Sequence, residues 1–458
     1  MPVQEIPQHL QELRASFRAG HTRPMAWRRK QLKRLKALLR ENEQALADAL
    51  HKDLRKSFFE AWITEINFTV NEIDHSLTHM EEWARPRAVD TPIAYQPASS
   101  EVRKEPLGVT LIIGPWNYPV QLILAPLAAA LSAGNCAVLK PSEMAPATAE
   151  VLGRLIPQYM DPQAVRVVQG AVPETTALLE QKWDHIFFTG STAVGRIVMK
   201  AAAEHLTPVT LELGGKSPCI VAADAPMNVA ARRILWGKLT NAGQTCVAPD
   251  YVLVERGAQD KLMAAIKSTL QSFYEGNPKA SKDYARIINT RHFDRLTGLL
   301  EGQHVALGGD SDRDDLYIEP TVVTDVDLDS PVMQQEIFGP ILPIIPWDTI
   351  QEAIDFVNDR EKPLALYVFT KKRATSEAVL QNTSSGGAGV NISVMHLGVP
   401  DLPFGGVGPS GTGAYHGQAG FDCFSHTKSV MTKSALIDPP VLYPPYSDFK
   451  KKVTRTLL

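Results

Sequence analysis

The sequence lacks most of the features that would place it in a specialised class of protein. It has only four cysteines in 458 residues, and no two of them form a Cys-x-x-Cys pair. We therefore expect neither a disulfide framework nor a metal site, and a reducing cytoplasm is the expected location. The formal net charge is −3, so no basic excess favours nucleic acid as a partner.

Long apolar runs are also missing. The longest, residues 122–133, is too short to cross a bilayer and is interrupted by Pro126. The first thirty residues are basic but lack the apolar centre of a signal peptide. We expect no stable membrane anchor and no secretory signal. With 44% hydrophobic and 21% charged residues, the composition is typical of a globular protein that acts on a small molecule.

The pattern of apolar residues divides the chain into parts. Residues 5–83 have helical spacing throughout, and residues 86–105 are polar and contain prolines. From Gly108 onward, short apolar strands alternate with helices, and a second alternating set follows Leu213. Such alternation predicts parallel sheets wrapped by helices, and the length of the chain predicts two domains. The fold class is therefore α/β, with two doubly wound domains.

One cysteine lies in a distinctive sequence, Asn241-Ala-Gly-Gln-Thr-Cys-Val-Ala-Pro249. Small residues before Cys246 and a proline after it suggest a thiol that is used chemically. A nucleophilic role requires surroundings that favour the thiolate and stabilise the product of its attack. Taken alone, Cys246 is better explained as a small hydrophobic residue in a core.

Four other segments contain candidate functional residues, each with a structural alternative. Glu212 lies between two leucines, where burial would raise its proton affinity and make it a general base, although strand alternation could point it to solvent. Asn117 follows a strand and offers an amide donor to an oxyanion, or it simply forms a turn. Residues 187–195 join a strand to a helix, which is a place suited to phosphate or else an ordinary strand-to-helix turn. Lys140 and Glu143 would hold a ribose or form a surface ion pair.

Taken together, these segments resemble the aldehyde dehydrogenase superfamily in order and spacing, over nearly the whole chain. The matching motifs are Pro115-Trp-Asn-Tyr-Pro119, Lys140-Pro-Ser-Glu143, Phe188-Thr-Gly-Ser-Thr-Ala-Val-Gly195, Leu211-Glu-Leu-Gly-Gly-Lys216, Gly243-Gln-Thr-Cys246 and Glu336-Ile-Phe-Gly-Pro340. Three further segments resemble the class 3 branch: residues 243–251, 403–408 and 413–417.

The resemblance implies NAD(P)-dependent oxidation of an aldehyde to a carboxylic acid. Cys246 would be the nucleophile, Asn117 would hold the oxyanion, and Glu212 would activate the water that hydrolyses the thioester. The remaining implied residues would bind the cofactor: Lys140 and Glu143 the adenosine ribose, Gly190, Ser191 and Gly195 the pyrophosphate turn, Glu336 the nicotinamide ribose and Phe338 the ring. NAD is the expected cofactor, and NADP is the alternative.

The resemblance also implies how the chain is organised. A Rossmann-like cofactor domain would comprise residues 1–83 and 105–212, and a catalytic domain residues 213–415. A small β arm for oligomerisation would comprise residues 84–104 and 416–440, followed by a tail at 441–458. A homodimer is the expected assembly.

The substrate is the part that the resemblance defines least. Trp116, Tyr118 and His396 would line the substrate funnel or serve in packing. Ile392 and Pro409 stand where class 3 members often carry other residues, which leaves specificity open but not the reaction. An acylating enzyme that passes the thioester to coenzyme A or phosphate is the alternative within the fold, and a non-catalytic role is the alternative outside it.

Overall fold

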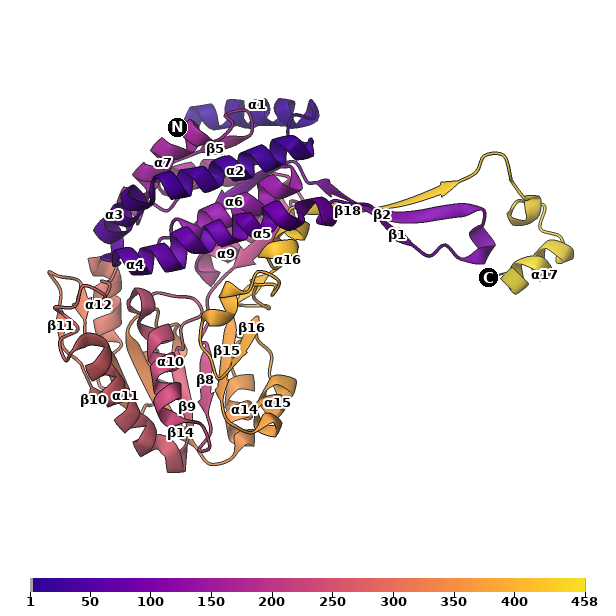
Figure 1. The fold of residues 1–458 in the computed structure, drawn as a ribbon. Coiled ribbons are helices and arrows are strands. Elements are labelled where there is room, and N and C mark those ends of the chain that lie inside the picture. The colour runs from indigo at the N-terminus through magenta and orange to yellow at the C-terminus, as the bar shows by residue number, and fades with distance from the viewer. Residues whose placement is uncertain (1–2, 458) are drawn as a thin grey trace.

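The first eighty residues form a helical layer. A computed structural model describes residues 3–457, and Figure 1 shows this layer in indigo and purple along one side of the molecule. Its helices are α1 (Ile6–Arg18), α2 (Met25–Glu41), α3 (Glu43–Leu54), α4 (Phe58–Ala61) and α5 (Asn67–Trp83). Their inward faces carry leucines, such as Leu35 and Leu39, that are fully buried. The helical spacing predicted for residues 5–83 is confirmed.

The first sheet has six strands in the order β17-β7-β6-β3-β4-β5. All neighbouring pairs are parallel except β17 with β7. The strands are β3 (Val109–Ile113), β4 (Cys136–Lys140), β5 (Val165–Val167), β6 (His185–Thr189), β7 (Val209–Glu212) and β17 (Gly411–Thr412). Four helices connect or cover them: α6 (Gln121–Ala133), α7 (Pro146–Tyr159), α8 (Val172–Leu179) and α9 (Thr192–Ala203). β3, β4 and β6 are buried along their whole length, as expected of parallel strands covered on both faces.

The second sheet has seven strands in the order β10-β13-β14-β9-β8-β15-β16. Only the edge pair β10 and β13 is antiparallel. The strands are β8 (Pro218–Val221), β9 (Tyr251–Glu255), β10 (His304–Leu307), β13 (Thr321–Thr324), β14 (Ile341–Trp347), β15 (Ala365–Phe369) and β16 (Gly387–Val390). The associated helices are α10 (Met227–Leu239), α11 (Gln259–Tyr274), α12 (Thr290–Gly298), α13 (Pro331–Gln334), α14 (Ile350–Asn358) and α15 (Arg373–Asn382), with a short hairpin of β11 (Ser311–Asp312) and β12 (Tyr317–Ile318). The predicted α/β class with two wound parallel sheets is confirmed.

A three-stranded ribbon projects from this body (Figure 1). It pairs β1 (Arg87–Val89), β2 (Ala98–Pro106) and β18 (Ser425–Lys433), all antiparallel. Helix α17 (Asp448–Leu457) lies at its far end. Helix α16 (Gly417–Cys423), just before β18, packs against α5 and α6. The domain boundaries expected from the sequence remain predictions.

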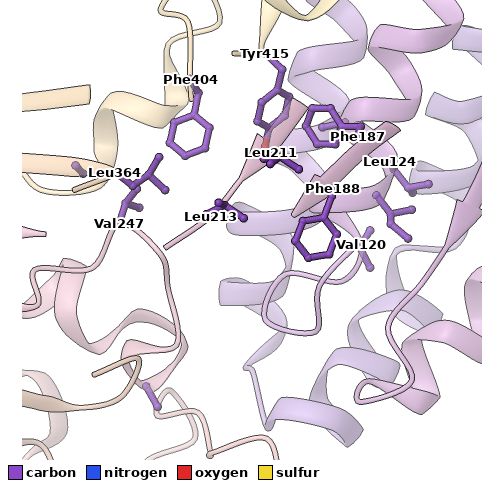
Figure 2. Close-up of a cluster of buried hydrophobic side chains, with 14 of the residues drawn as sticks. Val120, Leu124, Phe187, Phe188, Leu211, Leu213, Val247, Leu364, Phe404 and Tyr415 are labelled. Carbon is purple, nitrogen blue, oxygen red and sulfur yellow. The ribbon is translucent and has the colours of Figure 1, made fainter. Parts of the chain in front are cut away.

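Apolar side chains of the first sheet form a cluster with side chains from segments that precede strands of the second sheet. Figure 2 shows Phe187, Phe188 and Leu211 of the first sheet in one cluster with Val247 and Leu364 from the second part of the chain. All five side chains are buried. The segment between Glu212 and Pro218 passes from one sheet to the other. The apolar contact stabilises the arrangement of the two sheets on either side of this segment. No helix within residues 3–457 is long and apolar enough to span a bilayer.

Candidate active site

Three parallel strands of the first sheet end at the same edge. β3, β6 and β7 lie side by side; the loop with Asn117 follows β3, the turn at Gly190 follows β6, and Glu212 is the last residue of β7. Ligands of open α/β sheets bind at the carboxyl ends of the strands. This topology therefore brings together three of the segments that the sequence marked as functional.

The loop that carries Cys246 has an unusual backbone. Asn241, Ala242 and Gly243 adopt left-handed φ angles of 54°, 50° and 78° in succession. A side chain rarely tolerates this region, and a β-carbon on Gly243 would lie 2.3 Å from the carbonyl oxygen of Gly339. The small residues before the cysteine are thus required by a tight turn, and such strain is characteristic of functional sites.

The side chain of Gln244 holds this turn in place. Its amide nitrogen donates to the carbonyl oxygens of Asn241 and Arg286, each at 2.9 Å. Its amide oxygen accepts from the backbone N–H of Ile288 at 3.0 Å. Because Gln244 is fully buried, these bonds are shielded from water and fix the position of the neighbouring thiol.

A buried ion pair supports Asn117. The ammonium group of Lys56 lies 2.6 Å from a carboxylate oxygen of Glu65 and donates to the carbonyl oxygen of Asn117 at 2.8 Å, and both charged side chains are 0% exposed. The side-chain amide of Asn117 donates one N–H to the Gln244 carbonyl oxygen at 3.0 Å. Its second N–H is left to donate to a ligand at the thiol.

Two cavities meet at Cys246, which is half-buried between them. The polar cavity, about 280 Å³, is lined by residues that include Asn117, Gly190, Ser191, Glu212 and Glu336. The apolar cavity, about 230 Å³, is lined by residues that include Phe68, Tyr118, Trp236, Phe404, Tyr415 and His416. A ligand on either side would therefore reach the same sulfur atom.

Glu212 has the surroundings expected of a general base. It is 2% exposed, and neither of its carboxyl oxygens has a hydrogen-bond partner in the described part of the chain. Burial raises the pKa of this carboxyl well above its usual range. A buried carboxyl without partners is costly to a fold, so its presence beside Cys246 indicates a role toward a bound molecule.

The surroundings of the thiol do not favour the thiolate by themselves. Burial raises the pKa of Cys246, and the carboxylates of Glu336 and Glu212 raise it further. The backbone N–H groups of Cys246 and Val247 act in the opposite direction but more weakly. Near neutral pH the thiol therefore holds its proton, and a base must remove that proton before attack.

Glu336 and Phe338 lie in the polar cavity, as expected of residues that contact a nicotinamide ribose and ring. One oxygen of Glu336 is buried without a partner among residues 3–457, and the other lies where a β-carbon on Gly214 would be. Burial, followed by the charge of Asp250, raises the pKa of Glu336 to about 8. The Phe338 backbone has a φ of 53°, and its ring contacts Trp116 edge to face at 5.3 Å.

The predicted phosphate turn is also suitable for an anion. The hydroxyl of Ser191 accepts from the backbone N–H of Val194 at 3.4 Å and caps helix α9. Helix N-termini of this kind favour phosphate groups. Gly195 packs under Leu213, since a β-carbon there would lie 2.7 Å from that side chain. Together with the unpaired oxygen of Glu336, this turn fits a dinucleotide.

Lys140 and Glu143 lie at the end of β4, outside both cavities. Lys140 is almost fully buried, and its ammonium group is 3.2 Å from the half-exposed carboxylate of Glu143. The ion pair that sequence reasoning offered as the structural alternative is therefore present. It does not prevent a ribose from binding, because the Glu143 carboxylate remains accessible. Within residues 3–457, no three His, Cys, Asp or Glu side chains form a group suited to a metal ion.

The three predicted substrate residues occupy different places. Tyr118 lines the apolar cavity, and its hydroxyl forms a 2.6 Å hydrogen bond with Thr245. Trp116 lies in the polar cavity instead. His396 lines neither cavity, although its neighbours Met395 and Leu397 line the apolar one.

Sequence reasoning missed several lining residues. Phe404, Tyr415 and His416 line the apolar cavity, while His292 and Arg295 line the polar one. The first three lie in the two class 3 segments 403–408 and 413–417, so those motifs carry a signal that could have found them. His292 and Arg295 lie on α12, outside any motif, and only the tertiary fold brings them to the site.

The two departures from the class 3 pattern lie outside the apolar cavity. Ile392 packs beneath Gly389, where a β-carbon would lie 2.8 Å from its side chain. The carbonyl oxygen of Pro409 accepts from the hydroxyl of Thr192 at 3.2 Å, at the start of α9. Pro409 therefore supports the cofactor side of the site.

Known proteins resemble this chain over almost its whole length. The model of the aldehyde dehydrogenase family matches residues 3–430. Aldehyde dehydrogenase family 3 member A2 of Rattus norvegicus is 50% identical, covering 97% of this chain and 92% of its own. The dimeric NADP-preferring aldehyde dehydrogenase of Canis lupus familiaris is 46% identical, covering 97% and 98%. The substrate bound state of Staphylococcus aureus AldH superposes with a TM-score of 0.96 at 44% identity, covering 99% of each chain.

Replacing Gly243 with alanine should disturb the cysteine turn. The methyl group would meet the Gly339 carbonyl oxygen at 2.3 Å in backbone with φ +78°, so the turn must shift. We expect the rate of aldehyde oxidation to fall roughly 100-fold, as a displacement of about 1 Å can produce. The rate is measured by NADH formation and stability by thermal unfolding.

Gly298→Ala is the matched control. Gly298 ends helix α12, and no atom lies within 4 Å of the place that a β-carbon would occupy there. Alanine at this position should change stability by no more than about 1 kcal/mol and leave the rate intact. Equal rates in both variants would contradict a required left-handed turn at Gly243.

Proposed function

The chain belongs to the aldehyde dehydrogenase family, and we propose that Cys246, Asn117 and Glu212 perform its NAD(P)-dependent oxidation of an aldehyde to a carboxylic acid. The cofactors of the family are NAD and NADP. One observation carries the assignment of roles. Cys246 lies at the junction of an apolar cavity and a polar one, and the polar cavity contains both an amide donor and a carboxyl that has no partner within residues 3–457.

The first step is the attack of the Cys246 sulfur on the aldehyde carbon. The new carbon–sulfur bond converts the carbonyl oxygen to an oxyanion, and the thiol proton passes to a neighbouring base. The free N–H of Asn117 and the backbone N–H of Cys246 are the donors proposed for that oxyanion. Preorganised donors matter here, since losing one from such a hole costs roughly 100-fold or more in rate.

The second step oxidises the carbon attached to sulfur. A nicotinamide dinucleotide bound in the polar cavity would supply the hydride acceptor for this oxidation. Glu336 would hold its ribose, Phe338 would line its ring, and the N-terminus of α9 would receive its pyrophosphate. What remains on the enzyme is a thioester of Cys246.

The last step releases the acid. Glu212 removes a proton from water, the water oxygen attacks the thioester carbon, and the carbon–sulfur bond breaks to return the thiolate. The raised pKa of Glu212 makes it a strong enough base for this role once it is ionised. Deacylation should therefore accelerate as pH rises toward the pKa of Glu212.

The alternative within the fold is transfer of the acyl group to coenzyme A or phosphate. A base that activates water would waste the acyl group by hydrolysis, so the buried Glu212, which has no partner among the described residues, favours the free acid as product. A non-catalytic role would not require the thiol, the amide donor and the carboxyl to gather at one cavity.

Product analysis should give free carboxylic acid. With hexanal, NAD and coenzyme A together, we expect NADH and hexanoate in equal amounts and no excess of acyl-CoA, by chromatography and absorbance. Predominant acyl-CoA would establish the acylating alternative. Absence of NADH with a broad set of aldehydes and either dinucleotide would support a non-catalytic role.

Glu212→Gln should separate the two halves of the reaction. We expect a rapid burst of NADH of about one equivalent per site, followed by a slow steady state, because the thioester forms but is not hydrolysed. Stopped-flow absorbance measures both phases. Cys246→Ala is the control and should show neither phase while still binding the dinucleotide. Equal loss of burst and steady state in Glu212→Gln would assign Glu212 to activation of the thiol instead.

We also propose that the chain forms a homodimer through its arm. The three strands of the arm project from the body, and Ile93 between β1 and β2 is 75% exposed. A small sheet without a packed face is not stable alone, which favours a second chain against it. The relative from Canis lupus familiaris is named as dimeric.

All four cysteines are free, which supports a reducing location such as the cytoplasm.

Ile93→Asp should weaken this dimer. A carboxylate buried in the interface would lose its hydration without gaining a partner. The measured molecular mass should therefore fall toward that of a single chain when the protein is diluted. Sedimentation velocity measures the shift. Leu206→Asp is the matched control, since Leu206 is 91% exposed but lies after α9, remote from the arm. Dimers of equal stability in both variants would place the interface elsewhere.

A further inference from the structure

One polar side chain in the wall of the apolar cavity has no part in the proposed reaction. His416 is 3% exposed, lines the cavity, and forms no hydrogen bond through either ring nitrogen with any residue from 3 to 457. Most side chains around the cavity are apolar, and the Tyr415 hydroxyl in the same wall also lacks a hydrogen-bond partner within residues 3–457. A buried polar group that lacks a partner in the protein indicates a partner in the ligand.

The backbone holds His416 in this position at a conformational cost. Its φ and ψ are 77° and 140°, a region that residues other than glycine rarely adopt. The turn cannot easily relax, because Gly417 behind it has φ +47° and a β-carbon there would lie 2.3 Å from the Pro400 carbonyl oxygen. A strained backbone conformation therefore holds the imidazole in the wall of the cavity.

Aromatic rings enclose the imidazole. Phe404 stacks on it at 5.4 Å, Phe68 lies tilted at 5.5 Å, and Tyr415 meets it edge to face at 4.3 Å. Phe68, Phe404 and Tyr415 also line the cavity. Rings on several sides fix the plane of the imidazole, so its nitrogens are presented in a defined direction.

Among the described residues, Glu72 is the only acidic group within ion-pair distance of His416. A carboxylate oxygen of Glu72 lies 3.9 Å from Nδ1, too far for a hydrogen bond, while the other oxygen accepts from the backbone N–H of Gly417 at 3.2 Å. Burial lowers the pKa of His416 to about 3, so the ring is neutral near pH 7. A neutral imidazole donates through one nitrogen and accepts through the other, which suits a hydroxyl group.

We propose that His416 is a specificity-determining residue that binds a hydroxyl group on the aldehyde, remote from the carbonyl. The proposal rests on the proposed function, because it assigns the apolar cavity to the aldehyde attached to Cys246. The preferred substrates are then aldehydes with an apolar chain or ring that ends in a hydroxyl group. Simple alkanals enter the same cavity but leave the imidazole unsatisfied.

The test compares pairs of substrates that differ only in the distant hydroxyl. The probes are ω-hydroxyalkanals of increasing length, each paired with the n-alkanal of equal carbon number, and the readout is the ratio of their kcat/KM values. In the wild-type enzyme this ratio should pass through a maximum at one chain length. His416→Phe should lower that maximum roughly tenfold, as loss of one buried hydrogen bond does.

Two conservative variants and one control complete the design. His416→Gln places an amide near the position of Nε2 and His416→Asn near that of Nδ1, so whichever preserves the maximum identifies the nitrogen that binds. Trp236→Leu alters another part of the lining of the same cavity without adding a polar group, and should change both members of each pair together. Thermal unfolding and dinucleotide binding verify that each variant is folded.

The outcomes are distinguishable. A flat wild-type ratio at every length, or a maximum unchanged in His416→Phe, would overturn the role of His416 and leave aldehyde oxidation intact. Failure of the wild-type enzyme to produce NADH from any aldehyde would refute the proposed function itself. If His416→Phe does not fold, the Gln and Asn variants decide. A maximum retained in only one of them, while both still oxidise plain alkanals, supports the proposal, and equal ratios in the two variants would overturn it.

Discussion

The buried ion pair between Lys56 and Glu65 is the interaction on which the site depends. Lys56 holds the carbonyl oxygen of Asn117, and the second oxygen of Glu65 accepts from the backbone N–H of Val120 at 2.8 Å at the start of α6. The pair thus joins the helical layer to the strand-end loop. Removing one member of such a pair leaves the other charge buried, which costs about 3–5 kcal/mol.

The same contact extends to the cysteine loop. The carbonyl oxygen of Asn117 also accepts from the side-chain amide of Asn241 at 2.8 Å, and Asn241 is the first left-handed residue before the thiol. The amide donor and the nucleophile, which are far apart in sequence, are therefore positioned against each other through one carbonyl oxygen. A small displacement of the helical layer would therefore change the position of the Cys246 sulfur atom.

Much of the fold and part of the site could be predicted from the sequence. Buried parallel strands are continuous apolar runs, so their alternation with helical segments from Gly108 onward predicted two parallel sheets. Cys246, Glu212 and Asn117 were singled out because the order and spacing of their segments resemble one family, although each segment alone had a structural alternative. The cofactor contacts of Lys140 and Glu143 could not be decided, because an ion pair and a ribose site use the same residue types. His292 and Arg295 could not be assigned to a cavity from a local pattern, since only tertiary packing brings helix α12 to the site. The raised pKa of Cys246 was likewise hidden, because it reflects burial and carboxylates from distant segments.

The junction of two cavities at one sulfur atom has a kinetic consequence. The places proposed for the dinucleotide, in the polar cavity, and for the aldehyde, in the apolar cavity, are separate volumes, so neither molecule would exclude the other. Inhibitors shaped for the apolar cavity would then compete with the aldehyde and not with the dinucleotide, and the enzyme would follow a sequential rather than a substituted-enzyme rate law.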